Sequence, residues 1–309
     1  MVSKKKEGVF NMFYEYPIPE ITENTTKALV TLTPAESKRL IAKGVFAMPE
    51  IKKALDTDII IIARGTTNTY VAEEIMQINA ENKAAYYHRV INKAEYSRGV
   101  ITHGEFTVNQ RRDTGNDFVL KNGKVWDIKP QEVILQFKRN DVFLKGANAV
   151  DVWGGAGVLC AGADAGTIGY ALMSLIARDS NLIVPVGLEK MVPSVEDALN
   201  VTGVYNYKYS TGSPVVLIPL VKAKVVTEIQ ALAILFGVSA TMVGAGGIGG
   251  SEGTVALVIE GDEANVDKAF DLIKSIKGEK PVLAPEIMRP SGATFNWDAK
   301  DIQEGATRR

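Results

Sequence analysis

The chain contains very little cysteine and histidine. Its 309 residues include one cysteine, Cys160, and two histidines, His88 and His103. One cysteine excludes an intramolecular disulfide framework and any cysteine-rich zinc or iron–sulfur site. Two histidines argue against a multi-histidine metal site. We therefore expect neither a bound metal nor another cofactor.

The chain also lacks an excess of charge of one sign. Lys and Arg number 35 against 36 Asp and Glu, a formal net charge of −1. Binding to nucleic acid needs a concentrated positive field, so nucleic acid is not an expected partner. Residues 229–251 are uncharged and long enough to cross a bilayer, but their second half is too rich in glycine for a lipid-exposed helix. With no apolar secretory segment at the start, we expect a soluble, cytoplasmic protein without a membrane partner.

The composition predicts a large folded core. Hydrophobic residues make up 46% and charged residues 23% of the chain, which excludes disorder for most of its length. The length allows two domains, or one large α/β domain with a smaller attachment. The predicted units are an extended arm at 1–30, an α/β core at 31–213, a small α+β lid at 214–280 and a tail at 281–309.

Continuous apolar runs predict the core. Residues 58–63, 141–144 and 181–186 have the pattern of strands buried on both faces, which is typical of a parallel sheet. Thr33 and Glu36 form a capping box for a helix that we expect to end at Gly44. Further helices are predicted at about 49–55, 70–76 and 166–177.

Two segments depart from that pattern. About 84–140 is rich in aromatic and charged residues and carries an Asn-Gly turn at 122–123, so it predicts β-hairpins inserted between parallel strands. In the last third, we expect strands at 215–219, 240–243 and 255–260 and helices at 225–236 and 264–276. This order is close to a ferredoxin-like α+β half.

A polar stretch follows the first buried strand. It consists of Gly65, Thr66, Thr67, Asn68 and Thr69, at the start of a predicted helix. Backbone N–H groups and uncharged donors at such a place suit a phosphate or carboxylate. The alternative is an ordinary helix cap, for which Thr and Asn are preferred in any case.

A second polar stretch, residues 145–151, follows the next buried strand. In open α/β sheets ligands bind at this end of the strands. Lys145 and Gly146 could hold an anionic group there, while Asn148 and Asp151 could contact hydroxyls. The alternative is that Asn148 and Asp151 only turn the chain.

These stretches resemble motifs of a known superfamily. GTTNT after a strand is similar to the phosphate loop of ribose-5-phosphate isomerases and of the effector domains of DeoR-type regulators. KGANAVD resembles the isomerase motif Asp-Gly-Ala-Asp-Glu-Val-Asp, and SNLIVPVGLEKMV and SPVVLIPLVKAKVVTEIQALAILFG continue the order over about 200 residues. The same superfamily contains coenzyme A transferases and glucosamine-phosphate deaminases. The resemblance implies an isomerase-like α/β core, and by analogy a homo-oligomer.

The departures from the motif argue against ribose-5-phosphate isomerase activity. Lys145, Asn148 and Ala149 stand where the isomerase motif has its acids, and the stretch CAGADAGTIGY lacks the catalytic glutamate. Isomerisation needs a carboxylate-type base, and Asp164 is the acid available there. Asp164 is therefore a candidate general base or nucleophile, with Gly162 and Thr167 as flanking ligand contacts. The alternative for Asp164 is a helix cap.

Other features carry weaker hypotheses. The glycine-rich residues 244–253, with Ser251 and Glu252, predict a clamp over a ligand or a second phosphate site, or only a mobile hairpin. Cys160 is expected to be a buried inert thiol rather than a nucleophile. His103 is either a surface residue or a general acid.

We therefore expect an α/β protein that binds a small phosphorylated or acyl/carboxylate metabolite at the ends of its parallel strands. Its chemistry, if it has any, would be metal-independent isomerisation, hydrolysis or acyl transfer, with Lys145, Asp151 and Asp164 as catalytic candidates. The alternative is a non-catalytic metabolite sensor or a structural subunit.

Overall fold

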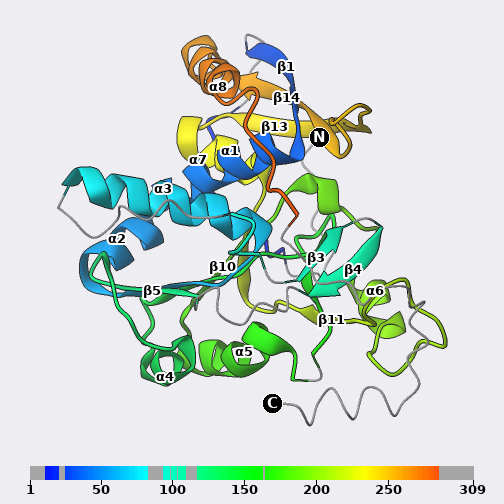
Figure 1. The fold of residues 1–309 in the computed structure, drawn as a ribbon. Helices are drawn as coiled ribbons and strands as arrows, with labels where there is room; N and C mark the ends of the chain where they lie inside the picture. Colours follow the sequence, from blue (N-terminus) through cyan, green and yellow to red (C-terminus); the bar gives the residue numbers. More distant parts are fainter. Residues whose placement is uncertain are drawn as a thin grey trace.

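The computed structural model describes residues 11–20, 25–82, 93–97, 99–102, 104–108, 117–162 and 164–284. Both histidines, and therefore the hypothesis on His103, lie outside these ranges, as does most of the predicted tail. The described chain is a mixed α/β protein whose largest sheet has both parallel and antiparallel strands (Figure 1).

The largest sheet confirms the buried runs as strands. Its order is β12 (Ala223–Val226), β10 (Asn181–Pro185), β7 (Val142–Leu144), β2 (Ile59–Ile62), β5 (Phe118–Lys121) and β6 (Lys124–Val125). The first four strands are mutually parallel, and β5 and β6 extend the sheet in antiparallel pairing. Asn122 and Gly123 both have positive φ, as the predicted Asn-Gly hairpin turn requires.

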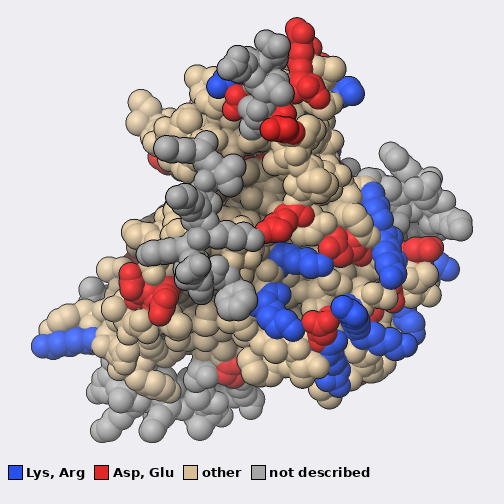
Figure 2. All heavy atoms as spheres, turned by 180° about the vertical axis from the view of Figure 1, so that it is seen from behind, with Lys and Arg blue, Asp and Glu red and all other residues tan. Residues whose placement is uncertain are grey.

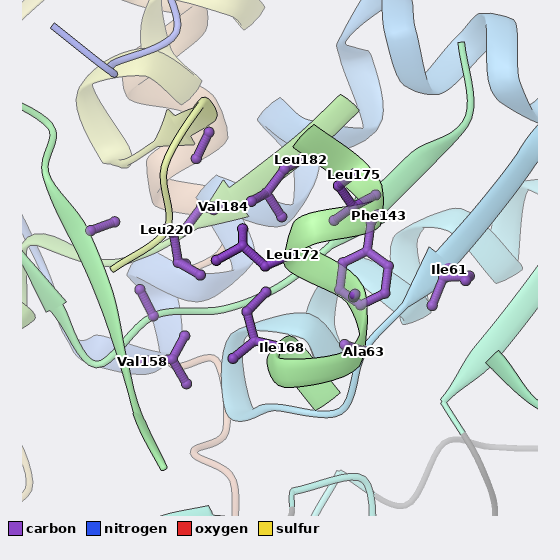
Figure 3. Packing of buried hydrophobic residues seen from close by; sticks show 14 of the residues in the cluster. Ile61, Ala63, Phe143, Val158, Ile168, Leu172, Leu175, Leu182, Val184 and Leu220 are labelled. Atoms are coloured by element: carbon purple, nitrogen blue, oxygen red, sulfur yellow. The ribbon is translucent and has the colours of Figure 1, made fainter. Parts of the chain in front are cut away.

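Helices cover both faces of this sheet. One face carries α1 (Pro34–Ala47), α2 (Pro49–Thr57) and α3 (Thr66–Asn82), and the other carries α4 (Pro130–Val133), a 3-10 turn (Ile134–Gln136) and α5 (Gly166–Arg178) (Figure 1). Successive strand residues point to opposite faces. Ile60 and Ile62 therefore pack against the α1–α3 side, while Ile61 packs with Phe143 and with Leu172 and Leu175 of α5 (Figure 3).

A separate antiparallel sheet lies above the core in Figure 1. Its order is β1 (Thr26–Leu32), β14 (Thr254–Gly261) and β13 (Ser239–Gly246), and its buried face packs against α7 (Glu228–Phe236) and α8 (Glu263–Ser275). Residues 26–30, predicted to belong to an extended arm, form part of β1. The alternation of exposed and buried residues in this strand follows from packing one face on α8.

The predicted lid at 214–280 is divided between three sheets. β11 (Val216–Pro219) pairs with β9 (Ala156–Cys160), and β9 also pairs with β8 (Ala149–Val150). β12 joins the largest sheet, so the helix predicted from residue 225 begins only at Glu228. Val225 and Val226 are fully buried, and this tertiary burial outweighs their local helical pattern.

The remaining elements complete the inserted region and the connections. β3 (Gly99–Thr102) and β4 (Glu105–Val108) form a hairpin, as predicted for the insertion, whereas β5 and β6 belong to the largest sheet. A 3-10 turn (Leu188–Lys190) and α6 (Val195–Val201) follow β10. The capping box of Thr33 and Glu36 is confirmed, but α1 continues through Gly44 to Ala47.

Candidate functional site

Four connections leave the carboxyl ends of the parallel strands. They are residues 63–65 after β2, 145–148 after β7, 186–190 after β10, and 227–228 after β12. Parallel strands deliver these connections to one edge of the sheet, where open α/β folds bind their ligands. The polar residues of this edge, which we call the carboxyl edge, form the candidate site.

The stretch Gly65–Thr69 is the first turn of α3 and its preceding residue. Thr67, Asn68 and Thr69 are almost fully buried, whereas Gly65 and Thr66 are partly exposed. The Asn68 amide donates hydrogen bonds to the carbonyl of Ala63 at 2.7 Å and to that of Leu144 at 3.1 Å. Asn68 thus ties the end of β2 to the end of β7. The geometry gives this residue a structural role, and anion binding by Gly65 and Thr66 stays a prediction.

Of the four candidates in residues 145–151, two are partly exposed and two accept backbone hydrogen bonds. Lys145 and Gly146 are partly exposed. Asn148 accepts a hydrogen bond from the N–H of Leu159 at 3.0 Å. The buried Asp151 carboxylate accepts bonds from the backbone N–H groups of Trp153, Gly155 and Val195 at 2.8–3.0 Å. Asn148 and Asp151 therefore have the geometry of the turn-forming alternative.

Asp164 lies just before α5, on the turn that leads into this helix. Its exposed carboxylate accepts a hydrogen bond from the N–H of Gly166 at 3.1 Å, as a helix cap does. The pKa of the Cys160 thiol is raised, mainly by burial and further by the negative charge of Asp164, while the positive charge of Lys145 opposes this shift. The charges of Lys145 and Asp164 therefore both act on the Cys160 thiol. Gly162 and Thr167 are partly exposed beside them. Cys160 itself is half-buried, with its thiol directed to the Ala165 carbonyl at 3.5 Å.

A buried polar group that sequence reasoning missed lies at the end of β2. The Asp117 carboxylate accepts a hydrogen bond from the Arg64 N–H at 2.9 Å, and the two side chains form an ion pair at 3.7 Å. The Tyr96 hydroxyl donates to the Ile62 carbonyl and accepts from the Phe118 N–H. Burial, and then the adjacent Asp117, raises the pKa of Tyr170.

A second missed group joins the connections after β10 and β12. Lys38 Nζ of α1 lies 3.1 Å from Glu189 Oε1, and both side chains are only about a tenth exposed. Lys190 Nζ donates to the carbonyl of Ala147, in the connection after β7, at 3.0 Å. The fully buried Glu228 carboxylate accepts a hydrogen bond from the Leu188 N–H at 3.0 Å. We call Lys38, Glu189, Lys190 and Glu228 the buried charge cluster.

Burial shifts two members of this cluster toward neutrality. Burial lowers the pKa of Lys190 to about 8, an effect that Glu189 opposes and Lys38 reinforces. Burial and the neighbouring Glu189 raise the pKa of Glu228 to about 7. Burial would also raise the pKa of Glu189, but Lys38 and Lys190 outweigh it and hold this carboxylate in its charged form. Strongly perturbed groups of this kind are typical of functional sites.

The glycine-rich turn lies against the same cluster. A Cβ placed on Gly253 would lie 3.1 Å from Pro34 and 3.6 Å from Glu189, so the turn after β13 approaches the start of α1 and the connection after β10. Within the exposed turn, the Glu252 carboxylate accepts a hydrogen bond from the Gly250 N–H, and the Ser251 carbonyl accepts from Thr254. The bonds found for Ser251 and Glu252 thus hold the turn itself, and ligand binding by them stays a prediction.

One sequence signal could have found part of the cluster. Glu189 and Lys190 follow the buried run 181–186, which is the same position after a strand that drew attention to Gly65 and Lys145. Lys38 and Glu228 carry no such signal. They reach the cluster only because α1 and α7 pack beside each other at this edge.

At the amino ends of the parallel strands, which we call the amino edge, charged side chains lie on the surface in mixed pairs. Viewed from behind, Lys and Arg side chains mingle with Asp and Glu on the side of α2 and α4 (Figure 2). Surface ion pairs occur at this amino edge, such as Lys222 with Asp179 at 3.0 Å and Lys224 with Glu50 at 2.6 Å. Lys222 and Lys224 therefore have carboxylate partners within 4.0 Å, unlike the ammonium of Lys190.

No group of three or more His, Cys, Asp or Glu side chains in the described ranges is arranged to hold a metal ion. None of the helices described is long and apolar enough to span a membrane. Compared with known proteins, the chain matches no family model, no curated protein and no solved structure.

Proposed function

We propose that the chain binds a small phosphorylated or carboxylate metabolite at the carboxyl edge of its parallel strands. The observation that carries this proposal is the ammonium of Lys190. Its one hydrogen bond goes to the Ala147 carbonyl, and no carboxylate of the described residues lies within 4.0 Å of it. Burial makes this cation costly and Glu189 and Glu228 act on it only from beyond 4.0 Å, so an anionic ligand would supply a closer counter-charge.

Neighbouring groups support the same ligand class. Lys145 lies two residues before Ala147, so its chain segment adjoins the Lys190 ammonium. Helix α3 begins at this edge with Thr66, directly after Gly65, and N–H groups at helix starts attract anions. Lys145 and the start of α3 thus offer partly exposed cationic and N–H donors at the carboxyl edge.

Thermal unfolding in the presence of candidate ligands tests the proposal. The panel would contain inorganic phosphate, ribose 5-phosphate, acetyl-coenzyme A and citrate. A ligand at 100 times its Kd stabilises by about 2.7 kcal/mol, which raises Tm by several degrees. We expect such a shift in the wild type and in Lys222→Ala, and its loss in Lys145→Ala. The absence of a shift with every compound would overturn the proposal.

A non-catalytic sensor is the second candidate function. The three backbone hydrogen bonds to the buried Asp151 carboxylate favour it, because they leave Asp151 committed to the fold, and the cap geometry of Asp164 points the same way. Asp164→Asn separates the two functions once a ligand is known. An enzyme that uses Asp164 would lose turnover, whereas a sensor would keep its thermal shift.

A further inference from the structure

The chain that follows α8 connects the small antiparallel sheet to the largest sheet. Residues 279–282, which we call the strap, run from the end of α8 past α1 toward the largest sheet (Figure 1). Glu279 and Val282 are its partly buried residues, and Val282 packs on the core cluster that contains Tyr70. Within the described part of the chain, no backbone group of residues 280–282 bonds to another backbone group. The strap is therefore held by side-chain contacts and not by a strand ladder.

The Glu279 carboxylate is the main attachment of the strap. It lies 2.9 Å from Arg39 Nε of α1 and 3.2 Å from Lys93 Nζ of the inserted region, and these three side chains are between 11% and 20% exposed. The Tyr70 ring of α3 faces both cations, with its centroid 5.0 Å from the guanidinium carbon of Arg39 and 4.1 Å from Lys93 Nζ. Its hydroxyl donates to the Lys280 carbonyl at 2.8 Å. The strap thus joins α1, α3 and the inserted region.

Two carboxylates of α3 share these cations with the strap. Glu73 lies 2.6 Å from Arg39 Nη2 and 3.3 Å from Lys93 Nζ, and Glu74 lies 2.8 Å from Arg39 Nη1. When Glu279 leaves, both cations therefore keep a counter-charge, and neither becomes an unpaired buried charge. Lys93 then pairs with Glu73 instead of with Glu73 and Glu279 together. Release of the strap thus weakens the attachment of Lys93 without unfolding α1 or α3.

Lys93 begins a turn, residues 93–97, that reaches the end of β2. Tyr96 in this turn is buried, and its hydroxyl donates to the carbonyl of Ile62, the last residue of β2. The same hydroxyl accepts from the N–H of Phe118, the first residue of β5, at 3.1 Å. The rings of Tyr96 and Phe118 stack with their centroids 4.8 Å apart. Tyr96 therefore joins β2 to β5 at the carboxyl edge.

Tyr96 also adjoins the ion pair of Arg64 and Asp117, whose side chains are 11% and 8% exposed. The pKa of Tyr96 is raised by burial and then by the charge of Asp117, while the Phe118 N–H and Arg64 oppose this shift. Arg64 belongs to the connection 63–65, so this group is part of the carboxyl edge. Displacement of Tyr96 would open the end of β2 to water and bring water to the ion pair.

We propose that the strap controls this part of the carboxyl edge: the Glu279 carboxylate holds the turn 93–97 in place, and its release opens the end of β2 beside Arg64 and Asp117. The opening is local and leaves the rest of the fold intact. It needs no ligand and therefore goes beyond the proposed function. The segment after α8 would thus set how often one end of the candidate site is open.

Native-state hydrogen exchange of the full chain measures this opening residue by residue. The reporter is the Phe118 amide, which is bonded to the Tyr96 hydroxyl. The reference is the Ala63 amide, which donates to the Leu144 carbonyl at 2.9 Å on the other side of β2. In Glu279→Gln we expect Phe118 to exchange about tenfold faster, because a charge-assisted hydrogen bond to Lys93 is lost, and Ala63 to exchange as in the wild type.

Three further variants serve as controls. Asp271→Asn removes the carboxylate of an exposed ion pair with Lys274 on α8, so it should change neither amide. Tyr96→Phe lacks the bridging hydroxyl and gives the exchange rate of the released Phe118 amide. Lys93→Gln should accelerate Phe118 as well, and adding Glu279→Gln to it should give no further acceleration, because the contact between the two residues is already absent.

The two amides also define the results that would contradict the proposal. A Phe118 rate equal to that of the wild type in Glu279→Gln would overturn it. Equal acceleration of Phe118 and Ala63 would overturn it too, because Glu279 would then stabilise the whole fold and not the turn 93–97.

Discussion

Gly44 of α1 and Ala231 of α7 lie in direct contact. A Cβ placed on Gly44 would lie 2.6 Å from the Ala231 Cβ and 2.7 Å from its Cα. Such separations are too short for carbon atoms, so the two helix backbones approach as closely as a glycine allows. Because α1 also packs on α3, this contact joins the small sheet's helix α7 to the helices of the largest sheet.

Gly44→Ala should destabilise the protein although alanine is the better helix former. The gain in helix propensity is about 1 kcal/mol, whereas overpacking a tight contact costs about 1–3 kcal/mol. The backbone of Ala231 is one of the clashing groups, so a rotamer change cannot relieve the strain. We expect a lower urea midpoint with an unchanged m-value. A midpoint equal to or above that of the wild type would contradict the close packing of α1 on α7.

Asn68 should be required for stability rather than for ligand binding alone. Its amide donates to the carbonyls of Ala63 and Leu144, which end neighbouring parallel strands. Asn68→Ala leaves two buried carbonyls without these donors and should cost about 1–3 kcal/mol. Asn68→Asp should cost more, because a buried carboxylate would face both carbonyls.

Chemical denaturation of the two Asn68 variants measures these costs. Thr66→Ala serves as the control, since Thr66 is partly exposed on the same turn and its hydroxyl makes none of these contacts. Wild-type stability in Asn68→Ala together with a lost ligand shift would instead favour a direct contact of Asn68 with an anion.

Glu36 should contribute a pH-dependent share of the stability. Burial alone would raise the pKa of its carboxyl, but bonds from the Gly278 and Thr33 N–H groups and from Lys277 outweigh it, so the pKa is lowered. A carboxyl with a lowered folded pKa stabilises above its unfolded pKa of about 4.5, and this contribution is lost as pH falls through the folded pKa.

The Glu36→Gln variant separates this charge from the side chain's shape. We expect a loss of about 1–3 kcal/mol at neutral pH that shrinks in acid, where the wild-type carboxyl is protonated too. Glu263→Gln, at the exposed first turn of α8, is the matched control and should change little at either pH. A loss that stayed constant with pH would mean that the charge of Glu36 contributes nothing.

Local patterns in the sequence identified much of the fold. The strands β2, β7 and β10, the capping box before α1 and the Asn-Gly turn are specified by neighbouring residues alone. The pairing of β1 with β14 joins residues more than 200 positions apart, and no local pattern encodes that partnership. Gly44 likewise predicts a helix end, because glycine commonly follows the last turn of a helix. Only the contact with Ala231 shows why a glycine stands inside α1 instead.

The candidate site was predicted only in part for the same reason. The position of Lys145 follows from the buried strand before it. Glu189 meets Lys38 and Glu228 only after three distant segments have folded together. The sequence shows that Asn68 and Asp151 can form hydrogen bonds. It does not show whether their partners are backbone groups of the protein or atoms of a ligand.

Glu228 should give the stability a pH dependence opposite in sign to that of Glu36. Its pKa rises from about 4.5 to about 7 on folding, so between these values the folded state holds a proton that the unfolded chain has lost. Stability therefore falls as pH rises through this window. Glu228→Gln is uncharged throughout, and its side-chain oxygen can still accept from Leu188. We expect its Tm to lose this decline, whereas Glu196→Gln on exposed α6 should keep it. An unchanged pH profile in Glu228→Gln would show that the Glu228 carboxyl stays charged in the folded protein, against the raised pKa that burial gives it.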